Sequence, residues 1–147
     1  MLGTVRSLSI KLEKGTKSTF RDSVQVTPYG LDGDHHTGRS RRRQILLLSS
    51  SVLDEFDLKP GELYENVVVD GIDVMSLREG QSLRVGDALV EVTIACESCI
   101  HMDRVRPGLQ EQLKHRRGMF VRVIAPGIVR VGDTVCEEPV SQKSLNF

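Results

Sequence analysis

The stretch Ser82-Leu83-Arg84-Val85-Gly86-Asp87-Ala88-Leu89-Val90-Glu91-Val92-Thr93-Ile94-Ala95 decides the fold of this chain. In its second half, apolar Val90, Val92 and Ile94 alternate with polar side chains, and this two-residue period is typical of a half-buried β-strand. Gly86-Asp87 is a tight-turn pair between two such segments. The stretch therefore predicts strands over 82–85 and 90–94, joined by a short turn.

The same pattern recurs along most of the chain. Turn residues separate the apolar segments at regular intervals, and the tetrapeptide Arg-Val-Gly-Asp of 84–87 occurs again at 130–133. Helical spacing of apolar residues occurs only over 50–57 and 107–116. Many short strands with few helices favour a mainly β fold, a mostly antiparallel barrel with a few short helices. The further strands we expect are 5–10, 24–26, 44–48, 66–69, 119–124 and 128–131.

Composition bounds the class of protein. The 147 residues are enough for a single domain, 1–147, with only the tail 137–147 loosely held. Lys+Arg and Asp+Glu are both 20, aromatic residues make up 4% and tryptophan is absent, so neither nucleic acid nor an acidic membrane is an expected partner. No apolar stretch approaches the roughly 18 residues that span a bilayer, and no secretory signal is recognisable. We expect a cytoplasmic protein.

Three cysteines form an odd count, which argues against a disulfide framework. Cys99 comes just after the predicted strand rather than in its apolar face, which favours a functional thiol over a small buried side chain. A thiolate is both a nucleophile and a soft metal ligand, and the cations of His101, Arg104 and Arg106 would stabilise it. Cys96 and Cys99 together are compatible with a redox pair or half of a zinc site, and we expect Cys136 to pack.

A polar loop precedes these residues by about sixty positions. It has the sequence Gly30-Leu31-Asp32-Gly33-Asp34-His35 and is followed by Arg39, Arg41, Arg42 and Arg43. Glycines let a backbone approach a ligand, and arginine forks with loop N–H groups bind phosphate. The alternative is turn chemistry for Asp34 and His35 and a solvated run of arginines. Asn66, next to Glu65, either supports this loop by hydrogen bonds or contacts a ligand.

In order and spacing, these motifs resemble the MOSC domain family, named after the C-terminal domain of molybdenum-cofactor sulfurase, and in particular its small standalone bacterial members. The resemblance covers about 24–136. It rests on the loop 30–35, Pro60-Gly61-Glu62, Glu65-Asn66, Gly80, Val85-Gly86-Asp87, the cysteine run 92–99 and Val131-Gly132-Asp133. In many small members of this family, the sequence around the thiol is similar to Gly-Pro-Cys-x-Pro-Cys. Here Ala95 and Ser98 replace both prolines, so the loop gains a backbone N–H and a free φ at 98.

The resemblance implies a MOSC-like β-barrel that binds the pterin-bound molybdenum cofactor, with Cys99 as the molybdenum ligand or the carrier of a persulfide sulfur. It implies reduction of N-hydroxylated substrates or sulfur transfer, with an external electron donor or a cysteine desulfurase-like sulfur donor as partner. We expect no pyridoxal-phosphate domain in this chain. The expected cofactor-binding residues, at one pocket whose rim carries Cys99, are Gly33, Asp34, His35, Arg42, Arg43 and Asn66.

Other classes of function remain open at this point. The domain is compatible with a non-enzymatic carrier that delivers cofactor or sulfur to partner enzymes. A CxxC thiol–disulfide protein is a further alternative, although no thioredoxin-like βαβ pattern surrounds Cys96 and Cys99. A domain that has lost its site is the last, because both prolines near Cys99 are missing.

Overall fold

The structure is a computed structural model that describes residues 2–139. Its helices are α1 (Ser50–Glu55), α2 (Met102–Val105) and α3 (Leu109–Gln112), with a 3-10 turn η1 (Val74–Ser76). Its strands are β1 (Leu2–Ile10), β2 (Thr19–Arg21), β3 (Ser23–Thr27), β4 (Gly30–Leu31), β5 (Ile45–Ser49), β6 (Val67–Asp70), β7 (Ser82–Val85), β8 (Ala88–Ala95), β9 (Met119–Ala125), β10 (Gly127–Arg130) and β11 (Thr134–Glu138).

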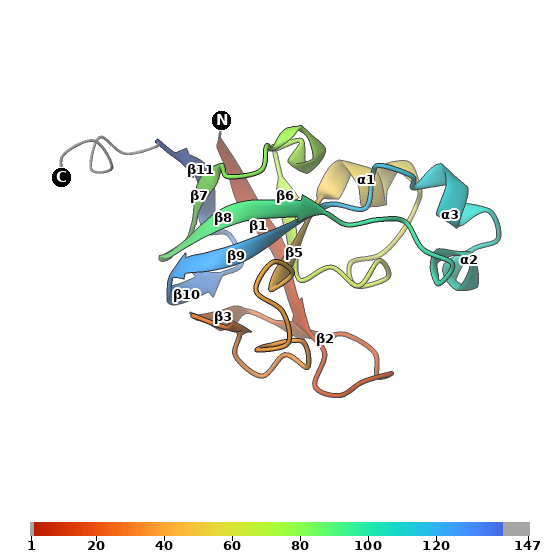
Figure 1. Cartoon of the computed structure of the whole chain (residues 1–147). Coiled ribbons are helices and arrows are strands. Elements are labelled where there is room, and N and C mark those ends of the chain that lie inside the picture. Colours follow the sequence, from red (N-terminus) through yellow and green to blue (C-terminus); the bar gives the residue numbers. More distant parts are fainter. Residues whose placement is uncertain (1, 140–147) are drawn as a thin grey trace.

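The main sheet closes into a barrel. Its strand order is β11-β7-β8-β9-β5-β6-β1-β2. Because β11 also pairs with β1, the seven strands from β11 to β1 form a closed ring. β2 pairs with the last residues of β1, outside this ring. All of these pairs are antiparallel except β5 and β6. These two strands are parallel, and the crossover connection between them contains α1. A smaller sheet, β10-β3-β4, lies against the lower part of the barrel in Figure 1. The mainly β barrel expected from the sequence is confirmed.

The hairpin predicted at 82–95 is present. Val85 pairs with Ala88 across the turn Gly86-Asp87, and β7 and β8 follow on either side. The second Arg-Val-Gly-Asp has a different role, because it joins β10 of the small sheet to β11 of the barrel. The same tetrapeptide therefore makes a hairpin once and a corner between sheets once.

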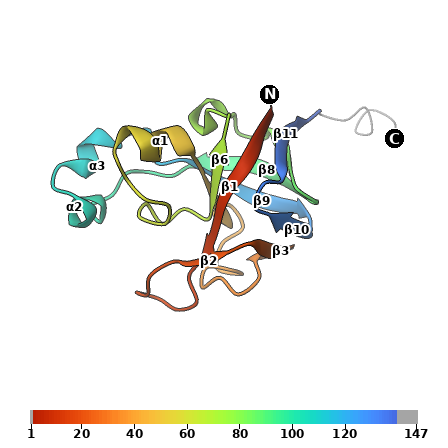
Figure 2. The ribbon, with the colours of Figure 1, turned by 180° about the vertical axis from the view of Figure 1, so that it is seen from behind.

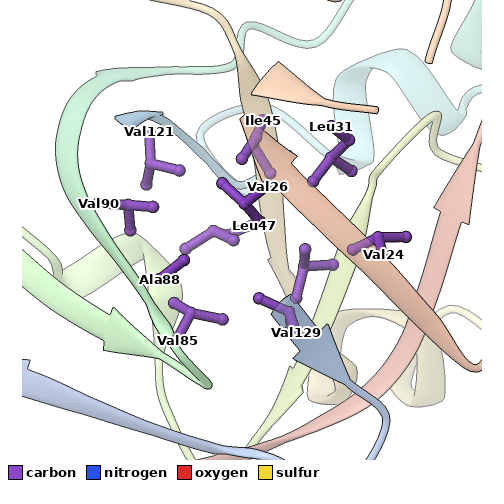
Figure 3. Close-up of a pocket in the computed structure, with 11 residues that line it drawn as sticks. Val24, Val26, Leu31, Ile45, Leu47, Val85, Ala88, Val90, Val121 and Val129 are labelled. Carbon is purple, nitrogen blue, oxygen red and sulfur yellow. The ribbon is translucent and has the colours of Figure 1, made fainter. Parts of the chain in front are cut away.

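The barrel interior is filled by aliphatic side chains. Every strand from β3 to β10 contributes valine, leucine, isoleucine or alanine side chains to one core. This core leaves an apolar cavity of about 10 Å³ (Figure 3). A cavity of this size with no polar lining stays dry. The inside of the barrel is therefore a packed core and not a ligand chamber.

A second apolar cluster lies outside the barrel and supports the helices. Leu48 of β5 and Val68 of β6 point outward, where they meet Leu53 of α1, Met102 of α2 and Leu109 of α3. Figures 1 and 2 show the three helices gathered on one side of the barrel. We call this group, Leu48, Val52, Leu53, Leu58, Leu63, Val68, Met102, Leu109 and Leu113, the outer cluster.

The helix expected over 50–57 forms as α1, but the one expected over 107–116 is wrong in extent. Only Leu109–Gln112 is helical. Gly108 has φ +82°, a left-handed conformation, so the helix cannot begin before Leu109. α2 was not predicted, and neither were β2 and β4, since segments this short carry no period. Glu137 and Glu138 of the tail belong to β11, while 140–147 lie outside the described residues. None of the helices in residues 2–139 is long and apolar enough to cross a membrane.

Candidate functional site

Cys99 lies beside a buried arginine that the sequence analysis did not identify. Arg117 is 3% exposed, and its Nη1 is 3.8 Å from Cys99 Sγ. The same guanidinium donates to the carbonyl oxygens of Leu63 at 2.8 Å and Glu97 at 3.3 Å. Its Nε is buried and has no hydrogen-bond partner among the described residues. A fixed cation in contact with a thiol is the usual environment of a reactive cysteine.

The loop that carries the cysteines is tied down at three points. Cys96 N–H donates to the carbonyl of Gly118 at 2.9 Å, and the Cys99 carbonyl accepts from Met102 N–H at 2.9 Å, where α2 begins. Ser98 Oγ donates to the carbonyl of Gln110 in α3 at 2.6 Å. Ser98 thus connects the loop to α3.

Gly118 explains how Arg117 comes to be buried there. It has φ +107°, and a Cβ at this position would lie 2.1 Å from the carbonyl oxygen of Leu47 in β5. Only glycine permits this approach. The close contact brings the start of β9 against β5 and places Arg117 beneath the cysteine loop.

Glu65 organises the segment on the other side of Arg117. It is 1% exposed and accepts hydrogen bonds from Gly61 N–H at 2.5 Å and Leu63 N–H at 3.2 Å. Burial raises the pKa of Glu65, although these N–H groups and the Arg117 charge oppose the rise. The chain curls around this carboxyl group and presents the Leu63 carbonyl to Arg117.

Cys96 opens into a groove between the end of β8 and α3. This thiol groove has a volume of about 480 Å³, and Met75, Glu97, Gln110 and Lys114 also line it. Burial raises the pKa of the Cys96 thiol and nearby Cys99 adds to the rise, while the charges of Arg117 and Arg43 oppose it. The lining includes Cys96 but not Cys99, which packs against the outer cluster.

A second groove is cationic. It has a volume of about 670 Å³, and four cations line it together with a single carboxylate, Glu62. Tyr64 forms part of the wall, with Lys11 Nζ 4.0 Å from its ring centroid. Burial lowers the pKa of Lys11, and the Asp34 charge opposes this. We call this site, with Lys11, Lys17, Lys59 and Arg104, the cationic groove.

The loop 30–35 acts on the cationic groove through Lys11. Asp34 Oδ1 accepts from Lys11 N–H at 2.8 Å, and His35 N–H donates to the Lys11 carbonyl at 2.6 Å. Burial alone would raise the pKa of Asp34, but hydrogen bonds from His36 and from Lys11 N–H outweigh it and lower the pKa. Gly33, at φ +85°, makes the turn possible. Asp34 and His35 therefore hold the backbone of a groove residue and do not line the thiol groove.

The other expected binding residues separate. Arg42 is exposed and pairs with Glu79 at 3.3 Å, whereas the Arg43 charge acts on Cys96. Asn66 uses both ends of its amide within the barrel: Oδ1 accepts from Leu46 N–H at 2.9 Å, and Nδ2 donates to the Ser9 carbonyl at 3.2 Å. Of these three residues, the structure brings only Arg43 near a cysteine.

The cations that follow Cys99 in sequence have other positions. Arg106 donates to the carbonyls of Phe56 at 2.6 Å and Asp57 at 3.2 Å, and Arg104 lines the cationic groove. The cation in contact with Cys99 is Arg117, and the only signal for it in the sequence is the glycine that follows it. Within residues 2–139, no group of three or more His, Cys, Asp or Glu side chains is placed to hold a metal ion. A metal at Cys99 would therefore have fewer than three ligands of these kinds from the described residues.

These features define a class: a closed β-barrel domain with an outer helical cover, which holds a thiol against a buried guanidinium. The profile of the MOSC domain matches residues 32–136, and the chain belongs to this family. The family is associated with binding of the molybdenum cofactor.

Solved structures share the fold. The YuaD protein of Bacillus subtilis superimposes with a TM-score of 0.79 at 23% identity, covering 92% of this chain and 94% of that one. YiiM of Geobacillus stearothermophilus gives 0.73 at 16% identity, covering 92% and 75%. YiiM of Escherichia coli gives 0.69 at 20% identity, covering 96% and 71%. No protein with curated annotation matches the sequence.

Proposed function

We propose that this domain binds the pterin-bound molybdenum cofactor, with the Cys99 thiolate as the sulfur ligand of molybdenum. The observation that carries the proposal is the contact between Cys99 Sγ and the buried Arg117 guanidinium. A fixed cation beside a thiol is the kind of environment that reactive and metal-binding cysteines have. Thiolates are soft ligands suited to such a metal.

The residues present fit this cofactor. Arg117 keeps a buried Nε without a partner among the described residues, which is a donor available to a bound group. The cationic groove lies just across the segment 61–65, since Leu63 of that segment contacts Arg117 and Tyr64 lines the groove. Four cations against one carboxylate suit the phosphate of the cofactor.

Each group of residues would have its own task. Arg117 holds the thiolate, and the cations of the groove bind the phosphate. Asp34 and His35 fix the backbone of Lys11 so that its side chain projects into the groove. When bound, the cofactor supplies the redox chemistry of its metal, while the protein supplies orientation and electrostatics. Turnover on N-hydroxylated substrates would draw electrons from an external donor.

The same thiol supports a second candidate, a sulfur carrier. All three cysteines are free, and a guanidinium stabilises a persulfide anion on Cys99 as it does a thiolate. In that case a cysteine desulfurase-like protein would load the sulfur, and the domain would deliver sulfur or cofactor to a partner enzyme.

The test is elemental and pterin analysis of the full chain purified from a host that makes the cofactor. We expect molybdenum and pterin in stoichiometric amounts in the wild type, loss of molybdenum in Cys99→Ser, and loss of pterin in the double variant Lys11→Ala/Lys17→Ala. Cys136→Ser, far along the sequence in β11, serves as the matched control and should stay loaded. Sulfane sulfur on Cys99 without metal would support the carrier, and a wild-type chain with neither would overturn both candidates.

A further inference from the structure

The cationic groove carries two aromatic rings in addition to its charges. Phe20 and Tyr64 both line it, and they are 55% and 41% exposed. One turn connects them, because Tyr64 N–H donates to the Gly61 carbonyl at 3.1 Å and a Cβ on Gly61 would lie 3.3 Å from Phe20 Cζ. Exposed rings in a concave site offer a planar ligand apolar surface to cover.

Tyr64 has a strained backbone, and buried groups hold it on both sides. Its φ is +62°, a left-handed conformation that is rare for a bulky residue. Before it, the Leu63 carbonyl accepts from buried Arg117 at 2.8 Å, and after it the buried Glu65 carboxyl group accepts from two backbone N–H groups. Strain of this kind persists only where the surroundings impose it, and it clusters at functional sites. Here it places an aromatic ring in the groove wall, with Lys11 Nζ over that ring.

Within residues 2–139, none of the four cations of the groove forms a salt bridge. Glu62, the one carboxylate of the lining, accepts from Lys59 N–H at 3.0 Å and is thus engaged by the backbone. Thr16 and Ser18 add hydroxyl groups to the same wall. Cations and hydroxyl donors together suit phosphate groups.

We infer that the cationic groove binds a nucleoside phosphate, with its base stacked on Phe20 and its phosphates on the cations. Among the described residues no cation or second ring lies over Phe20, whereas Lys11 lies over Tyr64, so Phe20 offers the free ring. Every base has a face that stacks on an aromatic ring, so this contact accepts any of them. The groove volume of about 670 Å³ lies in the range of pockets that enclose small ligands.

Nucleotide binding goes beyond the proposed function, which assigns the same cations to the phosphate of the cofactor. A nucleoside phosphate in the groove would therefore compete with the cofactor for these cations. Only this competition rests on the proposed function. Nucleotide binding itself needs the rings and the charges of the groove and neither cysteine.

The test is calorimetric titration of the full chain, produced in a host that cannot make the cofactor, with three probes. ADP has both a base and phosphates, pyrophosphate lacks the base, and adenosine lacks the phosphates. We expect ADP to bind about tenfold more tightly than pyrophosphate because its base stacks. Adenosine should bind more weakly than ADP, and added salt should weaken the binding of ADP and pyrophosphate but not that of adenosine.

Variants separate the ring from the charges. Phe20→Leu keeps an apolar side chain but removes the ring, so it should weaken ADP binding about tenfold and leave pyrophosphate binding unchanged. Phe20→Trp should retain the affinity for ADP. Lys17→Ala should weaken the binding of ADP and of pyrophosphate by the same factor. Tyr29→Leu is the matched control, because Tyr29 is an exposed aromatic residue that does not line the groove.

Three results would overturn nucleotide binding. They are the absence of ADP binding, an affinity for pyrophosphate or adenosine equal to that for ADP, and equal losses of ADP affinity in Phe20→Leu and Tyr29→Leu. Each leaves the proposed function standing if the chain from a cofactor-producing host contains molybdenum and pterin. A chain that binds ADP as expected but never contains molybdenum would overturn the proposed function alone.

Discussion

At the scale of the residue, Arg117 distinguishes the three cysteines from one another. It contacts Cys99, acts on Cys96 through its charge, and makes no hydrogen bond to Cys136 of β11 within residues 2–139. A thiolate, and not a thiol, reacts with an alkylating agent. The reactivity of the three thiols should therefore follow their distance from one guanidinium.

We expect Cys99 to react with iodoacetamide faster than Cys96, and much faster than Cys136, at neutral pH. Burial raises the pKa of Cys96 and slows it, whereas Cys99 has the cation in contact. Peptide mapping after timed labelling measures the three rates. Cys99→Ser should cost at most about 1 kcal/mol in the free energy of unfolding, because serine is nearly isosteric at this half-buried position. A thermal melt with a large loss, or slow labelling of Cys99, would identify it as a packing residue.

Asp34 carries a prediction about pH. Hydrogen bonds from His36 and Lys11 N–H lower the pKa of Asp34 below its ordinary 3.8 despite burial. The Asp34 carboxylate therefore contributes its full stabilisation at pH values above 3.8. This contribution disappears as the pH falls through the lowered pKa of the folded protein. Asp34→Asn should cost about 1–2 kcal/mol at pH 7, and the difference from the wild type should shrink below pH 3.8.

Urea titrations of both proteins between neutral and acidic pH measure this difference. Asp32→Asn, an exposed neighbour in the same loop, is the matched control and should change stability little. A cost that stays constant down to acidic pH would mean that the Asp34 charge is not what holds Lys11.

At the scale of the element, the sequence predicts strands better than helices. The main strands are long enough for the two-residue alternation to repeat several times. Alternation and one turn predict the β7–β8 hairpin, and in the structure the two strands pair across that turn. α2 and α3 have four residues each, and Gly108 separates the helical part of 109–112 from what precedes it. No period can be recognised over four residues, so these elements follow from tertiary contacts with the outer cluster.

The same limit applies to the candidate site. Cys99 was identified because it follows a predicted strand, and the loop 30–35 because its turn residues are dense. Arg117 was missed because burial of an arginine depends on the carbonyls of Leu63 and Glu97, which are distant in sequence. The loop's action through the backbone of Lys11 depends equally on a contact across 23 positions.

Gly118 gives a prediction for the junction between α3 and β9. Gly118→Ala would place a Cβ 2.1 Å from the Leu47 carbonyl at φ +107°, so β9 and β5 must separate or the backbone must change. We expect a loss of more than about 3 kcal/mol, together with faster labelling of both Cys96 and Cys99, because Arg117 would move with the strand.

Gly38→Ala is the matched control. Gly38 also has a positive φ, +82°, but a Cβ there meets nothing within 4 Å. Only the backbone strain, about 1 kcal/mol, should appear, with no change in cysteine labelling. Equal losses in the two variants, measured by chemical denaturation, would show that strain and not the approach to Leu47 makes glycine necessary at 118.

At the scale of the whole molecule, two separate apolar cores stabilise different parts of the structure. The barrel core inside the ring holds the strands together. The outer cluster holds α1, α2, α3 and the cysteine loop against the outside of β5 and β6 (Figure 1). Cys99 packs on the outer cluster and has no contact with the barrel interior among the contacts of the described residues. Stability and site geometry should therefore respond to different mutations.

Two matched truncations separate these roles. Leu113 belongs to the outer cluster and Leu83 to the barrel core, and both are 0% exposed. Each change to alanine removes the same atoms from a full core, so each should cost about 2–5 kcal/mol in the free energy of unfolding. Only Leu113→Ala should also accelerate iodoacetamide labelling of Cys96 and Cys99, because a cavity beneath α3 loosens the Ser98–Gln110 connection. Labelling under conditions where both variants are fully folded makes the comparison, and equal acceleration in Leu83→Ala would contradict a site supported by its own core.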